Sequence, residues 1–238
     1  MKHFILPVCL LFFVSVTAQQ SGQMLAYSTN GTMVDPDWKV HVVAADGWKG
    51  GNEVSGTIFY NDEMNNGYIV LQDGKITRNV SLRYNAYNHE INFMNGKTEM
   101  VLDAATPVHE FGYGFTTGND QKNIVFRAGY PGAGNNNAAT FYEVVVDRDL
   151  ALLRYVSKSI IEKTDDRGAS EKVVVDSDEW FIYNATDKSM VEIKKNKNAL
   201  IAALPQYAER IQKITSEKGL RLKSDADWYI LLSELSSK

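Results

Sequence analysis

The chain has almost no cysteine: Cys9 is the only one among its 238 residues. It lies inside an N-terminal apolar segment that we expect to be cleaved off, so the remaining chain would contain none. Disulfide bonds, thiolate metal sites and cysteine nucleophiles are thereby excluded for that chain. The fold must therefore depend on core packing and on backbone hydrogen bonds.

Long apolar runs are also scarce, and the longest stands at the N-terminus. Lys2 and His3 precede the run Phe4–Val16, and Val16-Thr17-Ala18 supplies a small-residue cleavage pattern. This run is shorter than the roughly 20 residues that a transmembrane helix needs. We therefore predict that residues 1–18 are a secretory signal peptide, with no transmembrane span after cleavage. The expected location is the periplasm or the cell surface, or outside the cell.

Basic charge is in short supply over most of the chain. From Gln19 to Asp187 there are 14 basic and 23 acidic side chains, whereas Lys188–Lys238 holds 10 basic and 6 acidic ones. An acidic body argues against nucleic acid as a partner, because phosphate contacts need a basic face. The basic C-terminal part is interpreted as a solvated helical face, with docking on the acidic body or on an anionic surface as alternatives.

Motifs for catalysis, metals and cofactors are missing as well. No Gly-x-Ser-x-Gly elbow occurs, and Gly132-Ala133-Gly134 lacks the context of a phosphate-binding loop. His41, His89 and His109 do not stand at a two-histidine metal spacing. The sequence thus predicts no metal, no cofactor and no identifiable catalytic residue. A pair of carboxylates stays open, because their separation is spatial and cannot be derived from spacing.

From Thr57 onward the sequence is typical of short strands separated by turns. Asp73-Gly74 and Asn95-Gly96 are two-residue hairpin signals, and carboxylate-rich Asp176–Glu179 is interpreted as a turn or cap. We predict a mainly β, antiparallel domain over 19–193 that forms a barrel, a roll or a sandwich. The expected strands are Tyr68–Gln72, Lys75–Val80, Leu82–Tyr87, Glu90–Phe93, Thr98–Leu102, Val108–Phe115, Asn123–Ala128, Thr140–Asp147, Ala151–Ile161, Lys172–Asp176, Glu179–Asn184 and Ser189–Ile193.

The last part of the chain, 194–238, changes to a helical period. Asn198 is predicted to cap a first helix that ends at Gly219, with Pro205 either kinking it or starting a second segment. Ser224 is predicted to cap a further helix, Asp225–Leu235. We expect a small two-helix element packed on the β body. The apolar face of its first helix consists of Leu200, Leu204, Tyr207, Ile211 and Ile214.

Several segments together resemble one family of proteins. Leu71–Lys75, Asn79–Ile91 and the aromatic strand Phe141–Val144 are followed by a helical tail that opens with Lys194–Lys197. With the predicted signal peptide, this layout is similar to an uncharacterised family of exported β-rich proteins from Bacteroidetes-type Gram-negative bacteria. The resemblance implies export and a β-rich body. The family has no assigned activity, so it implies no role for any residue.

The segment Leu82–Asn88 is the candidate recognition surface. On a strand, Arg83, Asn85 and Tyr87 point to one face and can offer a fork of donors and an aromatic platform. Such a face suits carbohydrate, peptide or carboxylate contacts. The alternative is a structural network in which Arg83 pairs with a carboxylate on a neighbouring strand.

These observations predict an exported envelope protein that acts as a non-enzymatic binding or structural module. Its expected partner is an envelope component, which can be a protein, a glycan or a lipid. One alternative is a hydrolase that acts on envelope or extracellular polymers through two carboxylates. Another alternative is a carrier of a lipid or other hydrophobic ligand, with a cavity between the sheet and the C-terminal helices.

Overall fold

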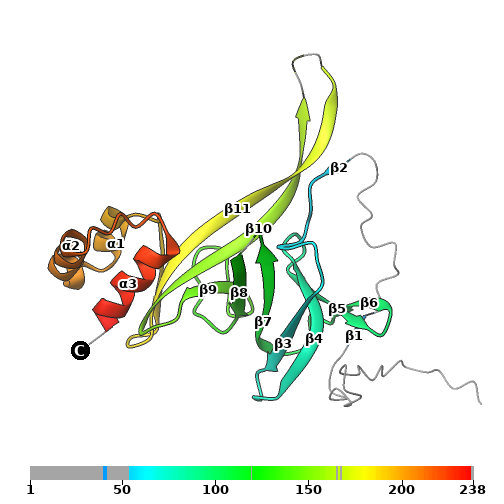
Figure 1. Cartoon of the computed structure of the whole chain (residues 1–238), viewed down its shortest axis with the longest axis horizontal. Helices are drawn as coiled ribbons and strands as arrows, with labels where there is room; N and C mark the ends of the chain where they lie inside the picture. The colour runs from blue at the N-terminus through cyan, green and yellow to red at the C-terminus, as the bar shows by residue number, and fades with distance from the viewer. Residues whose placement is uncertain (1–39, 42–53, 119, 165, 167, 237–238) are drawn as a thin grey trace, which may run out of the picture.

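The computed structural model describes residues 40–41, 54–118, 120–164, 166 and 168–236. The described chain folds into strands followed by short helices (Figure 1). The predicted signal peptide, 1–18, lies outside the described residues. The strands are β1 (Val40–His41), β2 (Val54–Ser55), β3 (Asn65–Leu71), β4 (Ile76–Asn85), β5 (Glu90–Asn95), β6 (Thr98–Leu102), β7 (Val108–Thr117), β8 (Asp120–Arg127), β9 (Tyr142–Val146), β10 (Leu150–Thr164), β11 (Ser170–Asn184) and β12 (Ser189–Ile193). The helices are α1 (Lys197–Ala203), the 3₁₀ turn η1 (Pro205–Tyr207), α2 (Ala208–Glu217) and α3 (Asp225–Ser236).

All of these strands belong to one 12-stranded sheet. Its order is β1-β6-β5-β4-β3-β7-β8-β9-β10-β11-β12, and neighbours along this path are antiparallel. The two-residue strand β2 pairs with β11 in parallel. The predicted class, a mainly β protein with antiparallel strands and a helical C-terminal element, is confirmed.

Two of the hairpin turns follow directly from local sequence. Asp73-Gly74 joins β3 to β4, and Asn95-Gly96 lies between β5 and β6. Gly74 and Gly96 have φ values of +85° and +61°, a backbone region that glycine adopts at little cost. The sequence therefore located these turns correctly.

The two strands predicted at Lys75–Val80 and Leu82–Tyr87 are one continuous strand, β4. Asn79 has a φ of +58°, and the register between β3 and β4 shifts between Gly67 and Tyr68. Such an irregularity is a β-bulge, which bends a strand without ending it. The strand ends at Asn85, so Tyr87 lies in the following turn.

The sequence predicts two separate strands, Lys172–Asp176 and Glu179–Asn184, and this is wrong because both segments lie in the long strand β11. The carboxylate-rich stretch Asp176–Glu179, interpreted as a turn or cap, is the middle of that strand. Asp176 is paired there with Lys158 of β10, with Nζ and Oδ1 3.1 Å apart. Cross-strand ion pairs favour extended backbone where composition alone suggests a turn. The β10–β11 hairpin projects from the body as an arm (Figure 1).

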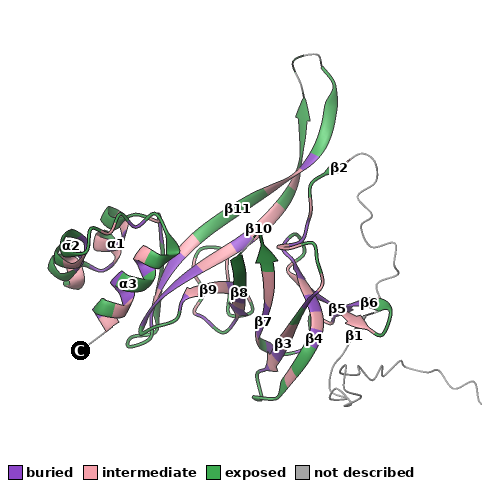
Figure 2. Ribbon diagram, in the orientation of Figure 1, coloured by how far each residue is buried: buried purple, intermediate pink, exposed green. Residues whose placement is uncertain are grey.

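The sheet rolls around its largest core. The backbone amide of Lys158 on β10 donates to the carbonyl of Ala86, just after β4, at 3.0 Å. Val156 of β10 lies in the same core as Tyr84 and Phe126, and Figure 2 shows this burial along the strands. Within the described residues, β1 and β12 are the two ends of the strand path and do not pair with each other. Of the predicted architectures, the body is therefore closest to a roll.

The helices and the start of β10 form a second hydrophobic core. The helix α3 contributes three fully buried side chains to this core: Trp228, Leu231 and Leu232. They lie in one cluster with Leu150 and Leu152 of β10, which point to the same face of the sheet because side chains alternate along a strand. The helix-to-sheet interface is thus filled by apolar side chains. It offers no support for the cavity that the hydrophobic-carrier alternative expects at this place.

The helix boundaries show that the predicted cap Asn198 is wrong and that Pro205 starts a separate segment. Asn196, rather than Asn198, caps α1, because its Oδ1 accepts the amide of Ala199 at 2.9 Å. Pro205 starts the separate turn η1, which is one of the two predicted outcomes. Gly219, with a φ of +64°, directly follows the end of α2, and Ser224 caps α3 as predicted.

Candidate functional site

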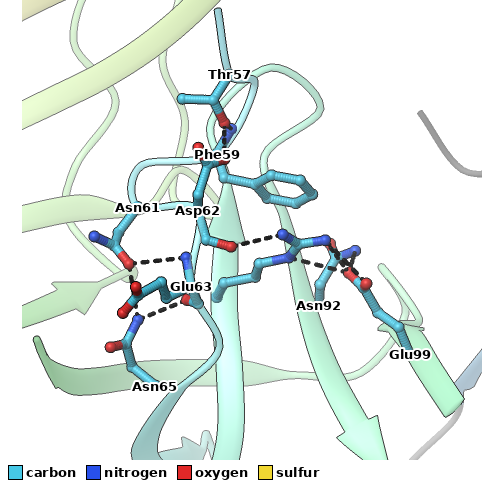
Figure 3. A network of polar contacts seen from close by, with 9 residues as sticks. Thr57, Phe59, Asn61, Asp62, Glu63, Asn65, Asn92 and Glu99 are labelled. Carbon is cyan, nitrogen blue, oxygen red and sulfur yellow. Dashed lines mark hydrogen bonds and ion pairs between the residues drawn. The ribbon is translucent and has the colours of Figure 1, made fainter. Parts of the chain in front are cut away.

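Arg83 is held inside a polar network with Asp62 and Glu99, and Glu99 also accepts from the Asn92 side-chain amide; Figure 3 labels these three residues. The Nη2 of Arg83 lies 2.9 Å from both carboxylate oxygens of Glu99, and its Nη1 donates to the carbonyl of Asp62 at 2.7 Å. Its guanidinium also lies 3.5 Å from the ring centroid of Phe59. Glu99 stands on β6, two strands away from β4. Arg83 therefore takes part in the cross-strand structural network that was the predicted alternative to a recognition surface.

Asn85 and Tyr87 do not continue the face that Arg83 presents. Asn85 is buried, and its Oδ1 accepts the backbone amides of Tyr87 and Asn88 at 3.0 and 3.1 Å. Asn85 thus organises the β4–β5 turn, and Tyr87 is 42% exposed within that turn. The structure therefore does not gather the three predicted residues into one patch, and their role in binding stays a prediction.

A cleft opens at one end of the roll. It has a volume of about 440 Å³, which lies within the roughly 300–1,000 Å³ typical of small-molecule sites. Its apolar wall includes Ile91, Leu102, Val108 and Phe141. Its polar wall includes Asn88, His89, Glu90, Gln72 and Asp103. The mouth of a rolled sheet is a common place for a ligand, and this cleft is the candidate functional site.

The loop between β6 and β7 forms one side of the cleft and is held by its own hydrogen bonds. Asp103 Oδ1 accepts the amide of Ala105 at 2.8 Å, and the amide of Thr106 donates to the Asp103 carbonyl at 2.8 Å. The amide of Gln72, after β3, donates to the carbonyl of Pro107 at 2.7 Å. These bonds keep the wall of the cleft in place without a ligand.

His89 lies on the opposite side, in the β4–β5 turn, where it connects two distant strands. Its Nδ1 is 3.0 Å from the hydroxyl oxygen of Tyr84, and its Nε2 is 2.9 Å from that of Tyr155. A neutral imidazole has one donor and one acceptor nitrogen, so one tyrosine donates to the ring and the other accepts from it. Burial lowers the pKa of His89, which favours this neutral form. Its φ of +60° is unusual for histidine and is held by these contacts.

Two buried arginine–carboxylate clusters lie outside the cleft. Arg127 pairs with Glu110, with Nε and Oε2 2.6 Å apart, and also with Asp147. Arg154 pairs with Glu143, with Nε and Oε2 2.8 Å apart. Burial raises the pKa of the Glu143 carboxyl, against the opposing effect of Arg154. Both carboxylates are held by arginines, as is typical of structural ion pairs on a half-buried sheet.

The described residues hold no group of three or more histidine, cysteine or acidic side chains placed to bind a metal ion. In the same part of the chain, none of the helices has the length and apolar character needed to cross a bilayer.

The cleft brings together residues that sequence reasoning did not combine. Asn88, His89, Glu90 and Ile91 are consecutive, yet the His89 partner Tyr155 and the lining residue Phe141 come from far along the chain. Asn88 ends the predicted recognition segment Leu82–Asn88, which was the local signal nearest to this turn.

Comparison with known proteins shows no relative: no family model, no curated protein and no solved structure matches this chain.

Proposed function

We propose that this protein is an exported, non-enzymatic binding module that holds a small amphipathic ligand in the cleft at the end of the roll. The observation that carries the proposal is the cleft itself. It joins an apolar wall, including Phe141, to a polar wall that contains Glu90, and it is bounded by a hydrogen-bonded loop on one side. Ligand sites are concave and mostly apolar, with a few polar groups that orient the ligand.

Export and a place in the periplasm or at the cell surface are part of the same proposal. They are supported by the N-terminal pattern, a short basic start followed by an apolar run and small residues. The resemblance to exported β-rich proteins of Bacteroidetes-type bacteria supports the same location. Fractionation of cells that express the full chain, with detection of a shortened product outside the cytoplasm, tests this part. A full-length product confined to the cytoplasm would contradict it.

The carboxylate hydrolase has weaker support than the binding module. Glu90 and Asp103 both line the cleft, but both are partly exposed. Glu110 and Glu143, whose side chains are 16% and 13% exposed, lie in arginine ion pairs outside it. A general acid with a raised pKa, of the kind such hydrolysis uses, would have to be desolvated and aimed at the substrate. The geometry therefore favours binding over hydrolysis.

The binding proposal can be tested with a neutral fluorescent probe, N-phenylnaphthylamine, whose emission rises in apolar surroundings. Ala139 lines the cleft and is exposed at its rim, so Ala139→Trp should fill the space without disturbing the core. Ala138 is also exposed but does not line the cleft, so Ala138→Trp is a matched control. We expect probe fluorescence with the parent protein and with Ala138→Trp, and its loss with Ala139→Trp. No fluorescence with the parent protein, or equal fluorescence with both variants, would overturn the proposal.

A further inference from the structure

We infer that the ligand of the cleft is an amphiphile whose polar end is a protonated amine and whose body is apolar. This inference rests on the proposed function and names the class of ligand that the same cleft would take. It depends on the charges around the cleft, on the position of Glu90, and on the aromatic and aliphatic residues of the lining.

Among the described residues that line the cleft, the formal charge has one sign: Glu90 and Asp103 carry carboxyl groups and none is lysine or arginine. His89 also lines the cleft, and burial lowers the pKa of its imidazole, which favours the neutral ring. A carboxylate or phosphate ligand would therefore meet like charges and no cationic side chain among these residues. Such a contact disfavours binding, whereas an ammonium group is attracted.

Glu90 is placed to meet the polar end of the ligand. It begins β5, pairs with Asn85 of β4, and is partly exposed in the cleft. The side-chain Nδ2 of Asn88 donates to Glu90 Oε2 at 3.3 Å. This contact orients the carboxylate and leaves Oε1 to accept from a ligand. An alkyl ammonium is a three-fold donor, so carboxylate and side-chain amide oxygens at the rim match its hydrogen-bonding needs.

The aliphatic and aromatic part of the lining requires an apolar body on the ligand. Phe141 packs edge-to-face on Phe111, with ring centroids 5.1 Å apart and an interplanar angle of 78°, which fixes its ring at the wall. Ile91, Leu102 and Val108 complete this side. A hydrated polyamine without an apolar body would leave this surface in water, so it would lack most of the favourable contact.

Three competitors with the same carbon chain separate charge from apolar contact. Octylamine, octanol and octanoate are each used to displace N-phenylnaphthylamine from the purified protein at neutral pH, where the amine is protonated and the carboxylate ionised. We expect octylamine to compete best, octanol less well and octanoate least. Putrescine, a short diamine without an apolar tail, is expected not to compete.

Glu90→Gln provides the residue-level test, with Glu192→Gln, an exposed carboxylate on β12, as the control. We expect Glu90→Gln to raise the concentration of octylamine needed for displacement by about tenfold, the size of a charge-assisted hydrogen bond, and to leave octanol unchanged. Glu192→Gln should change neither. Two results would overturn the amine assignment while the probe still binds: octanoate competes as well as octylamine, or Glu90→Gln weakens all competitors equally. In both cases the cleft remains a binding site. Absence of probe binding would instead contradict the proposed function itself.

Discussion

The hydroxyl oxygen of Tyr155 lies 2.9 Å from Nε2 of His89, although 66 residues separate the two in sequence. Their rings are also stacked, with centroids 5.2 Å apart and an interplanar angle of 27°. Tyr155 stands on β10 and His89 in the β4–β5 turn, so this contact joins two parts of the sheet that are not neighbours in the strand path. It closes the roll beside the cleft.

The first prediction concerns pH. Burial lowers the pKa of His89 in the folded protein below the ordinary histidine value of 6.5, so the unfolded chain binds the proton more readily. Stability from this group is fully present above about pH 6.5 and is lost as the pH falls through the lower folded pKa. Urea unfolding between pH 7 and pH 5 should show this loss. His89→Asn, a residue that tolerates positive φ, should have a smaller loss over the same interval, and an identical loss would contradict the assignment.

The second prediction concerns the Arg83–Glu99 pair. Arg83 is only 19% exposed, and its removal leaves the Asp62 carbonyl without this donor. It also takes the positive charge away from the Glu99 carboxylate, which keeps a hydrogen bond from the Asn92 side-chain amide. Arg83→Ala should lower the free energy of unfolding by about 2 kcal/mol, measured by urea denaturation. Glu99→Gln keeps a hydrogen-bond acceptor for the arginine and should cost less. Equal stability of Arg83→Ala and the parent protein would show that the network is not stabilising.

The third prediction tests the surface proposed from the strand motif. Tyr87 is 42% exposed, so Tyr87→Ala should change the unfolding free energy by no more than about 1 kcal/mol. If the turn contacts an envelope component, affinity capture from native envelope followed by mass spectrometry should lose that component with Tyr87→Ala. Tyr229→Ala removes a similarly exposed tyrosine from α3 and should retain it. Unchanged capture with Tyr87→Ala would discard this surface.

The fourth prediction concerns the buried pair Glu143 and Arg154. Glu143→Leu would leave the guanidinium half-buried without its main partner, and we expect a loss of about 3–5 kcal/mol in unfolding free energy. The double variant Glu143→Leu with Arg154→Met replaces both charges by apolar side chains of similar size. It should recover most of that loss, as measured by thermal and urea unfolding. A double variant as unstable as Glu143→Leu alone would show that the cost arises from packing rather than from an unpaired charge.

The fifth prediction compares two neighbouring asparagines at the start of α1. Asn196→Ala removes the side-chain oxygen that accepts the amide of Ala199 and should cost about 1 kcal/mol. Asn198→Ala lies inside the helix and is exposed, so it should be neutral or slightly stabilising because alanine has the higher helix propensity. Thermal unfolding of both variants decides between the cap seen in the structure and the one expected from sequence; the reverse order would favour Asn198.

Local signals predicted most of the secondary structure. Glycine turns located the hairpins at Gly74 and Gly96, and a serine cap located the start of α3. The failures occurred where a distant partner overrides local preference. The stretch Asp176–Glu179 has the composition of a turn, but it is extended because Lys158 and the rest of β10 pair with it.

The candidate site was less predictable than the fold. Asn88 could be assigned to the end of the candidate recognition segment Leu82–Asn88, and Arg83 could be assigned to either of two roles. Sequence spacing does not say which residues will face one cleft, because Phe141 reaches it from a loop far along the chain.

By itself, the sequence determined that the protein is mainly β, that its strands alternate with tight turns, and that a helical segment follows them. Those properties depend on the side-chain period and on the φ preferences of single residues. Only the tertiary structure decided that the sheet rolls, that Arg83 is bound to Glu99, and that His89 joins Tyr84 to Tyr155 beside the cleft. These features depend on contacts between residues far apart in the chain, and such contacts form only when the whole sheet closes around its core.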